Sequence, residues 1–394
     1  MFLSSTHLFL NGLVFALVKD GVLRLTDYEG TVLSLDLEGR VLVYAKGNTT
    51  YRRTMQNHYL EIKYIDGRRK VRVLGSESGL KIGEGAFEFA RTCINGIKDE
   101  QIGKVLERIA RRGPGFLQED ADKFVKVYGG EVPIVPPDQY FPVYLQATVG
   151  CYWNRCTFCN LYRGKKYSVK DFDEFKEHLS QVKKFFGEGI SARRGVFLGD
   201  ANSIIINQDL LRKDLELVHD ELRLPVYSFV DSITTQKVKT YEDLLEISRL
   251  GVRRIYLGFE TGSVRVLELL DKPIDLDGTR DLIINAKKTG ISVGIITLAG
   301  AGGKEYYKEH VEKTAEFISG LPLDRNDIIY ISPLYIYQGL PYSGISQKVG
   351  RLTGAEQEQQ YLQLKSLTNE KFRSLHGYAL DAPVVIYDLI ESIY

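Results

Sequence analysis

Cysteine is scarce in this sequence, with four among 394 residues, which is too few for the disulfide framework of a small secreted protein. The formal net charge is only +1, so no global field attracts nucleic acid or an anionic membrane, and either partner would need a local patch. No apolar run reaches the ~18 unbroken residues of a membrane span. These absences predict a cytoplasmic protein with reduced thiols and no membrane partner.

The first 80 residues have the pattern of a small β-rich domain. Residues 1–18 are apolar but lack the basic start and the small-residue cleavage site of a signal peptide, so we interpret them as strands. Short Val- and Leu-rich runs follow, separated by turn signals that are typical of antiparallel hairpins. The signals are Asp20-Gly21, Glu29-Gly30, Glu38-Gly39 and Asp66-Gly67.

Residues 81–140 are predicted to form a helical segment and a linker. Apolar residues recur at helical spacing from about residue 85 to 127, and Gly113-Pro114-Gly115 interrupts them. A Pro-rich run just before residue 141 excludes a helix there and predicts the linker into the next domain.

From residue 141 to 340, short strand-like runs alternate with amphipathic helical patterns. The alternation predicts six strand–helix units and hence an α/β fold, a partial (β/α)6 barrel of the TIM type. Residues 341–394 are expected to supply a helix near 355–370 and a tail that docks back onto this core. In such folds the chemistry lies at the carboxyl ends of the strands.

A loop after the first of these strands holds Cys151, Cys156 and Cys159. A plant-type [2Fe–2S] site has this spacing but needs a fourth cysteine, and the remaining one, Cys93, lies far upstream on a predicted helix. Structural zinc would also need a fourth ligand. Three thiolates on a [4Fe–4S] cubane would instead leave one iron open as a catalytic position, and we favour this interpretation.

At this loop the sequence resembles the radical S-adenosylmethionine (SAM) superfamily, whose motif is C-x3-C-x-Φ-C with an aromatic residue at Φ. Phe158 occupies Φ, but four residues rather than three separate Cys151 from Cys156. The resemblance implies that SAM chelates the open iron and is cleaved to a 5′-deoxyadenosyl radical, which takes hydrogen from a substrate. It also implies a one-electron donor such as ferredoxin or flavodoxin. The sequence does not identify the substrate.

The resemblance extends over residues 142–337, in the order of the predicted strands. Gly258 to Ser263 is similar to the G-x-E-S-G-S element of the Elp3-like and coproporphyrinogen-oxidase-like branch, with Thr261 in place of the first Ser. The residues that the resemblance places near SAM are Phe158, Gly199, Asp200, Asn202, Asp231, Glu260, Ser263 and Gly300.

Each polar member of this set has a structural alternative. Asp200 and Asn202 would begin a helix, and Asp231 would cap the next segment. Glu260 would form an ion pair with a nearby arginine, either Arg253 or Arg254.

Other residues receive simpler interpretations. Cys93 lies among apolar residues and is predicted to be a buried core thiol. His178 and His310 fall on the polar sides of predicted helices and are expected at the surface. No second cysteine triad is present in the sequence, which indicates a single-cluster enzyme.

The basic segment 51–72 leaves a second function open. Its Lys and Arg residues alternate with tyrosines, a pattern that occurs on RNA-binding surfaces and also on solvated sheet faces. The alternative is therefore a catalytically silent, metal-stabilised binding protein that contacts RNA through this hairpin.

Overall fold

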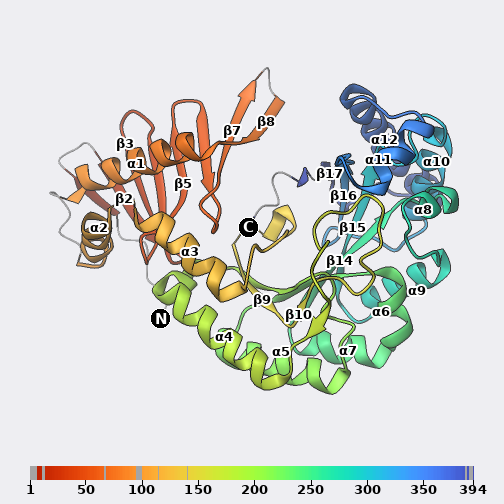
Figure 1. Ribbon diagram of the computed structural model, residues 1–394, viewed down its shortest axis with the longest axis horizontal. Helices are drawn as coiled ribbons and strands as arrows, with labels where there is room; N and C mark the ends of the chain where they lie inside the picture. The colour runs from red at the N-terminus through yellow and green to blue at the C-terminus, as the bar shows by residue number, and fades with distance from the viewer. Residues whose placement is uncertain are drawn as a thin grey trace.

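The computed structural model describes residues 7–10, 14–65, 68–94, 100–113, 115–139, 141–386, 388–389 and 394. It contains an antiparallel sheet of eight strands and a sheet of seven strands whose neighbours are all parallel. The first sheet, with α1 and α2 against it, lies on one side of the molecule, and the second sheet with its helices lies on the other (Figure 1). The predicted fold class, a parallel α/β core preceded by antiparallel strands and helices, is confirmed.

The antiparallel sheet follows chain order, because each strand pairs with its sequence neighbour. Asp20 and Gly21 have positive φ, as the tight turn between the second and third strands requires. Asp66-Gly67 lies outside the described residues, although the strands on either side of it do pair. The strands are β1 (His7–Leu10), β2 (Val14–Lys19), β3 (Val22–Asp27), β4 (Val32–Asp36), β5 (Val41–Lys46), β6 (Thr49–Arg53), β7 (Tyr59–Ile65) and β8 (Arg68–Val73).

One face of this sheet packs against α1 (Ser76–Thr92) and α2 (Glu100–Arg112). Alternate residues such as Leu23, Leu25 and Leu33 point into that core, as the period of two in a strand dictates. Cys93 is 1% exposed in the same core, and its thiol donates to the Phe89 carbonyl oxygen at 3.1 Å. The prediction of a core thiol is confirmed.

The parallel sheet contains all six predicted strands in order, and a seventh at its edge formed by the C-terminal run. The strands are β9 (Pro142–Gln146), β12 (Gly195–Gly199), β13 (Val226–Val230), β14 (Val252–Glu260), β15 (Ser292–Ala299), β16 (Ile328–Pro333) and β17 (Val384–Ile386). The Tyr394 hydroxyl donates to the Pro142 carbonyl oxygen at 2.6 Å, so the chain end joins one edge of the sheet to the other.

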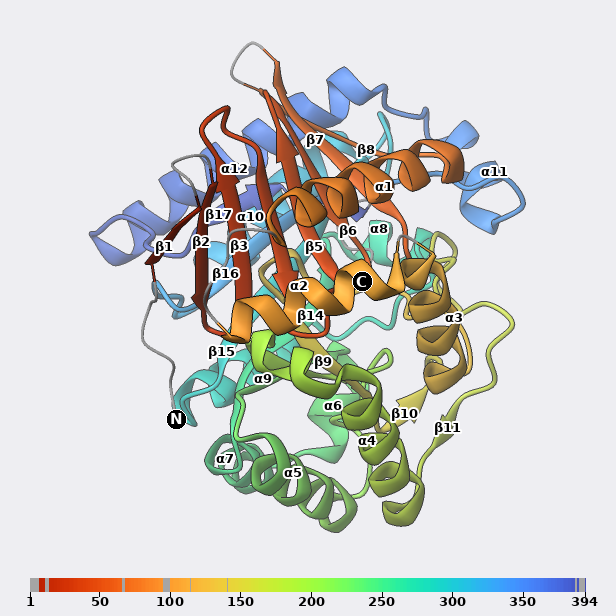
Figure 2. The ribbon, with the colours of Figure 1, turned by 90° about the vertical axis from the view of Figure 1, so that its left-hand side faces the viewer.

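Helices connect these strands and cover the sheet, as Figure 2 shows from a second side. They are α4 (Phe172–Phe186), α5 (Gln208–Leu222), α6 (Ser232–Val238), α7 (Tyr241–Arg249), α8 (Val264–Leu269), α9 (Leu276–Lys288), α10 (Tyr307–Ser319), α11 (Pro341–Lys348) and α12 (Gly354–His376). Among the described residues, no helix is both long enough and apolar enough to cross a membrane.

Two histidines expected at the surface are buried, so that prediction is wrong. The His178 ring accepts a hydrogen bond from the Gln146 backbone at 3.1 Å, and burial lowers the pKa of His178 to about 3. His310 is 0% exposed, and burial lowers its pKa to about 4. Both rings are therefore neutral at physiological pH.

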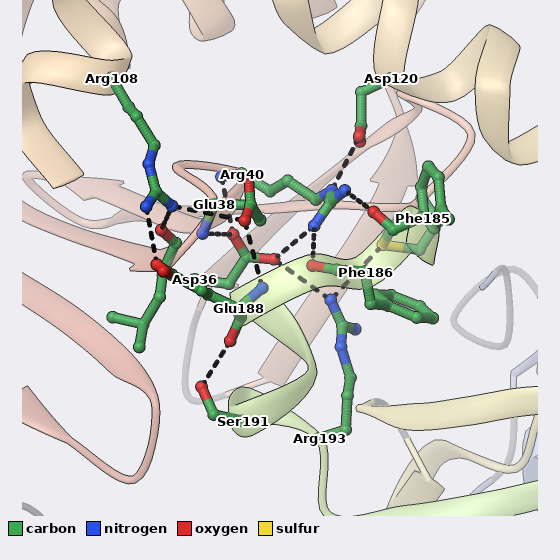
Figure 3. A network of polar contacts seen from close by, with 12 residues as sticks. Asp36, Glu38, Arg40, Arg108, Asp120, Phe185, Phe186, Glu188, Ser191 and Arg193 are labelled. Carbon is green, nitrogen blue, oxygen red and sulfur yellow. Dashed lines mark hydrogen bonds and ion pairs between the residues drawn. The ribbon is translucent and has the colours of Figure 1, made fainter. Parts of the chain in front are cut away.

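A buried charge network joins the two sheets (Figure 3). Arg40, in the turn between β4 and β5, donates to Asp120 of α3 (Phe116–Tyr128) at 2.8 Å and to the backbone carbonyls of Phe185 and Phe186 at 2.6 and 3.1 Å. Asp36 lies 3.3 Å from the same guanidinium group. The network fixes the N-terminal sheet against the end of α4.

Candidate functional site

The three cysteines lie in one loop at the carboxyl end of β9. Two short strands, β10 (Thr148–Val149) and β11 (Ser168–Val169), pair with each other and close residues 150–167 into the cysteine loop. Gly150 opens this loop with φ +76°, a conformation that favours glycine. Its backbone N–H donates to Asp200 at 2.8 Å, which holds the loop at the end of the neighbouring strand β12.

A second set of contacts docks the cysteine loop on the end of α8. The Trp153 indole N–H donates to the Asp271 carbonyl oxygen at 2.7 Å. The Thr157 hydroxyl donates to the Leu269 carbonyl oxygen at 2.8 Å, and its backbone N–H donates to Leu270 at 3.0 Å. The last carbonyls of a helix lack partners within the helix, and these hydrogen bonds supply them. The same bonds hold the cysteine loop against the end of α8.

All three cysteine thiols are free and line one cavity of about 220 Å³. Burial raises the pKa of Cys156 to about 12 and also raises the pKa of Cys159. These thiols are therefore neutral without a bound cation, and a metal or cluster would have to displace their protons.

The three thiols offer the kind of donor set that an iron–sulfur cluster uses. Within the described residues, no three His, Cys, Asp or Glu side chains are gathered closely enough to hold one metal ion. Each thiolate of a cubane binds a different iron, so its thiolates stand farther apart than the ligands of one ion. The donor set is all sulfur, which also suits an iron–sulfur cluster.

An ion pair stands in the same cavity, between Glu260 at the end of β14 and Lys272. The Lys272 ammonium lies 3.0 Å from the Glu260 carboxylate, and the two side chains are 15% and 8% exposed. Burial alone would lower the pKa of Lys272. The nearby Glu260 and Cys156 together raise this pKa by more than burial lowers it, so the net direction is upward. A Cβ on Gly258 would lie 2.7 Å from the Glu260 carboxylate, so the glycine leaves room for the pair.

The structural alternative for Glu260 is wrong, because neither arginine reaches it. Arg254 lies 2.6 Å from Asp138, and Arg253 donates to the Ser248 carbonyl oxygen at 2.7 Å. Lys272 takes their place, although no motif in the sequence singles it out. Its one signal is its position just after a helix that follows the Gly258–Ser263 element.

Four of the residues that the resemblance placed near SAM line the cavity, namely Phe158, Asn202, Asp231 and Glu260. The Asn202 amide donates to Asp231 at 2.6 Å and to the Thr235 hydroxyl at 2.9 Å. Its amide oxygen is buried and has no hydrogen-bond partner in the described part of the chain. Asp231 also caps α6, as its structural alternative proposed.

The other four residues lie outside the cavity lining: Gly199, Asp200, Ser263 and Gly300. Asp200 is fully buried, where its carboxylate accepts hydrogen bonds from the Tyr144 hydroxyl at 2.9 Å and the Gln146 amide at 3.0 Å. It does not begin a helix, because α5 is capped by Asn207 instead. Its observed role is to hold the cysteine loop through Gly150.

Ser263 and Gly300 each make contacts within the protein. The Ser263 hydroxyl caps α8 and donates to Glu309 at 2.7 Å. The Gly300 backbone N–H donates to the Gln360 amide oxygen of α12 at 2.6 Å.

The fold and the loop thus define a parallel α/β core with three thiols at the carboxyl edge of its sheet. Residues 145–318 match the model of the Radical SAM superfamily, so this segment of the chain is a radical SAM domain. The superfamily uses a [4Fe–4S] cluster and SAM. No curated protein matches the chain significantly.

Several solved structures are similar at low identity. The methyltransferase TsrM from Kitasatospora setae is 15% identical, with a TM-score of 0.43 over 54% of this chain and 40% of TsrM. Methylornithine synthase (PylB) is 16% identical, with a TM-score of 0.42 over 79% of each chain. Coproporphyrinogen III oxidase (HemN) from Escherichia coli is 16% identical, with a TM-score of 0.43 over 65% of this chain and 56% of HemN. Similarities this weak support no conclusion about activity.

Proposed function

We propose that this enzyme holds a [4Fe–4S] cluster on Cys151, Cys156 and Cys159, cleaves SAM reductively and takes hydrogen from a substrate. The observation that carries the proposal is that three thiols from one loop line the same cavity as the buried Glu260–Lys272 pair. When bound, the cluster supplies one electron to the sulfonium C–S bond of SAM. The chain must bind and orient SAM and exclude water.

The charged groups of the cavity match the methionine part of SAM. That part carries one ammonium and one carboxylate. The Glu260 carboxylate is opposite in charge to the ammonium, and the Lys272 ammonium is opposite in charge to the carboxylate. Both side chains are mostly buried, so their charges act in a medium of lower dielectric than water.

The remaining lining suits the nucleoside part. The Asn202 amide oxygen is a buried acceptor that needs a donor, and Asp231 beside it is a second acceptor, so both suit ribose hydroxyls. Phe158 and Leu298 give the cavity an apolar wall on which an adenine ring can pack.

Anaerobic reconstitution tests the proposal. The wild-type chain should bind about four iron and four sulfide, and dithionite with SAM should release 5′-deoxyadenosine. Changing any one of Cys151, Cys156 and Cys159 to Ala should abolish the cluster, whereas the matched control Cys93→Ala should keep it, because that thiol lies in the N-terminal core. A fully reconstituted protein that releases no 5′-deoxyadenosine would overturn the proposal.

The silent binding protein is not favoured, because the match to the radical SAM model includes the three cysteines and most of the residues that line the cavity. Part of the basic hairpin is also neutralised within the protein, since Arg72 and Lys63 both pair with Glu61, at 2.5 and 3.0 Å. We also propose that the enzyme is cytoplasmic, because the cluster would persist in that reducing compartment.

A further inference from the structure

The cysteine loop carries an unusual concentration of positive charge. Residues 151–170 contain five Lys and Arg and no Asp or Glu, in a chain whose net charge is +1. Four of the five define what we call the basic patch: Arg155, Arg163, Lys165 and Lys166. Such a local excess in a nearly neutral chain indicates a surface for a negatively charged partner.

The structure leaves most of this charge unneutralised. Arg163 and Lys166 are exposed and Lys165 is partly exposed, and none of the three forms a salt bridge with a carboxylate in the described part of the chain. Lys165 donates to the backbone carbonyl of Glu131 at 3.2 Å, which satisfies a hydrogen bond but not its charge. Arg155 alone has an acidic neighbour, Asp271 at 3.4 Å.

The basic patch is connected directly to the cysteines. The exposed Arg163 guanidinium donates to the Cys159 carbonyl oxygen at 3.0 Å and to the Cys156 carbonyl oxygen at 3.1 Å. Tyr152, next to Cys151, is 59% exposed and packs edge-on against Tyr167. In Figure 2 the paired strands β10 and β11, which close the loop, lie at the edge of the molecule. A protein seated on the patch would therefore stand within a few bonds of the thiols.

We propose that the basic patch is the docking surface of a small acidic one-electron carrier protein, which reduces the cluster through the cysteine loop. This role rests on the proposed function, because it requires a cluster on the three cysteines. In the transfer the carrier loses one electron and the cluster gains one, and no covalent bond forms or breaks. Complementary charge steers such short-lived encounters and sets their orientation.

An RNA strand is the competing polyanion. The position of the charge favours the electron carrier, since the cations lie on the loop that holds the cysteines and Arg163 contacts two of them. RNA held here would stand on the outer side of the loop rather than in the cavity where a hydrogen-abstracting site is proposed.

The test uses cluster-loaded protein and a flavodoxin of net negative charge as the probe. We expect the double variant Lys165→Glu/Lys166→Glu to bind flavodoxin at least about tenfold more weakly than wild type by calorimetric titration, with a shallower dependence on salt. The matched control Lys19→Glu/Lys46→Glu makes the same charge change at two exposed lysines of the N-terminal sheet and should bind like wild type. Circular dichroism and iron content establish that both variants fold and carry the cluster.

Dithionite separates this proposal from the function on which it rests. A small inorganic reductant needs no docking surface, so release of 5′-deoxyadenosine with dithionite should be the same in both variants and in wild type. Equal flavodoxin affinity in all three proteins would overturn the docking surface while leaving the function intact. Binding of an oligoribonucleotide that depends on Lys165 and Lys166, without binding of flavodoxin, would also overturn the docking surface. If the wild-type protein released no 5′-deoxyadenosine with dithionite, the proposed function itself would be overturned.

Discussion

Lys272 places a positive charge against Glu260 inside the cavity that the three cysteine thiols also line. Lys272→Met should weaken SAM binding about tenfold or more, because it removes one of the two charges that match the methionine part and leaves Glu260 buried without its partner. Equilibrium dialysis of the cluster-loaded variant measures this loss, and iron content should stay at the wild-type value.

Lys272→Arg is the matched control, since it keeps the charge and should retain much of the affinity. Gly258→Ala tests the same site from the other side, because the added Cβ would crowd the Glu260 carboxylate. Wild-type affinity in Lys272→Met would remove this residue from the proposed SAM site.

Asp214 of α5 is fully buried, and neither carboxylate oxygen has a hydrogen-bond partner among the described residues. Burial raises the pKa of this carboxyl from 3.8 to about 7. The folded state therefore binds the proton more tightly than the unfolded state, and stability should fall as the pH rises from about 4 to about 7. A shift of this size corresponds to at most about 4 kcal/mol.

The variant Asp214→Asn should flatten that pH dependence and unfold at a higher urea concentration than wild type at pH 8. Asp220→Asn, at an exposed position of the same helix, is the control and should change little. Identical pH profiles for wild type and Asp214→Asn would show that Asp214 does not carry the effect.

Residue-level expectations succeeded where local pattern decides the environment and failed where distant contacts decide it. The cysteine spacing placed three thiols in one loop, and the apolar neighbours of Cys93 placed it in a core. The burial of His178 depends on its contact with Gln146 of β9, which lies 32 residues earlier in the sequence. Lys272 meets Glu260 only because a strand end and a helix end converge, and sequence periodicity carries no information about that.

Among the elements, the six longer strands of the parallel sheet were predictable because each contains a short, mostly apolar run flanked by turn residues. The short elements were not. β17 has three residues and α6 has seven, and a pattern of that length does not distinguish a strand or helix from a loop. The cysteine loop was located by its residues, but its docking on α8 required the structure.

That docking predicts an effect of Thr157→Val, which keeps the side-chain shape and removes the hydrogen bond to Leu269. A net hydrogen bond contributes about 1 kcal/mol, so a chelator should remove iron several-fold faster from the variant than from wild type. Thr92→Val is the matched control, since its hydroxyl makes an equivalent bond to Phe89 in the N-terminal unit. Equal rates of iron loss in all three proteins would show that this bond does not stabilise the loop.

On the scale of the whole molecule, the order of the two sheets along the chain could be predicted, but not how they meet. Each sheet buries its own core, and the patterns that specify those cores are local. Their junction is a polar network between residues 80 to 157 positions apart, such as Arg40 with Asp120 and Asp36 with Arg193. Isolated arginines and aspartates in a sequence give no sign of such partners.

The junction leads to a prediction about folding cooperativity. Arg40 is 3% exposed and holds Asp36, Asp120 and two carbonyl groups at the end of α4. Arg40→Met leaves both carboxylates buried without this cation, which should lower the free energy of unfolding by about 3–5 kcal/mol. If the network is what couples the two sheets, thermal unfolding of the variant should separate into two transitions, with the N-terminal unit unfolding first.

Arg108→Met removes a more exposed arginine of the same junction, which pairs with Glu38 and Glu188, and should lower stability by about 1 kcal/mol with one transition retained. A small effect of Arg40→Met, equal to that of Arg108→Met, would mean that apolar packing rather than the charge network holds the two sheets together.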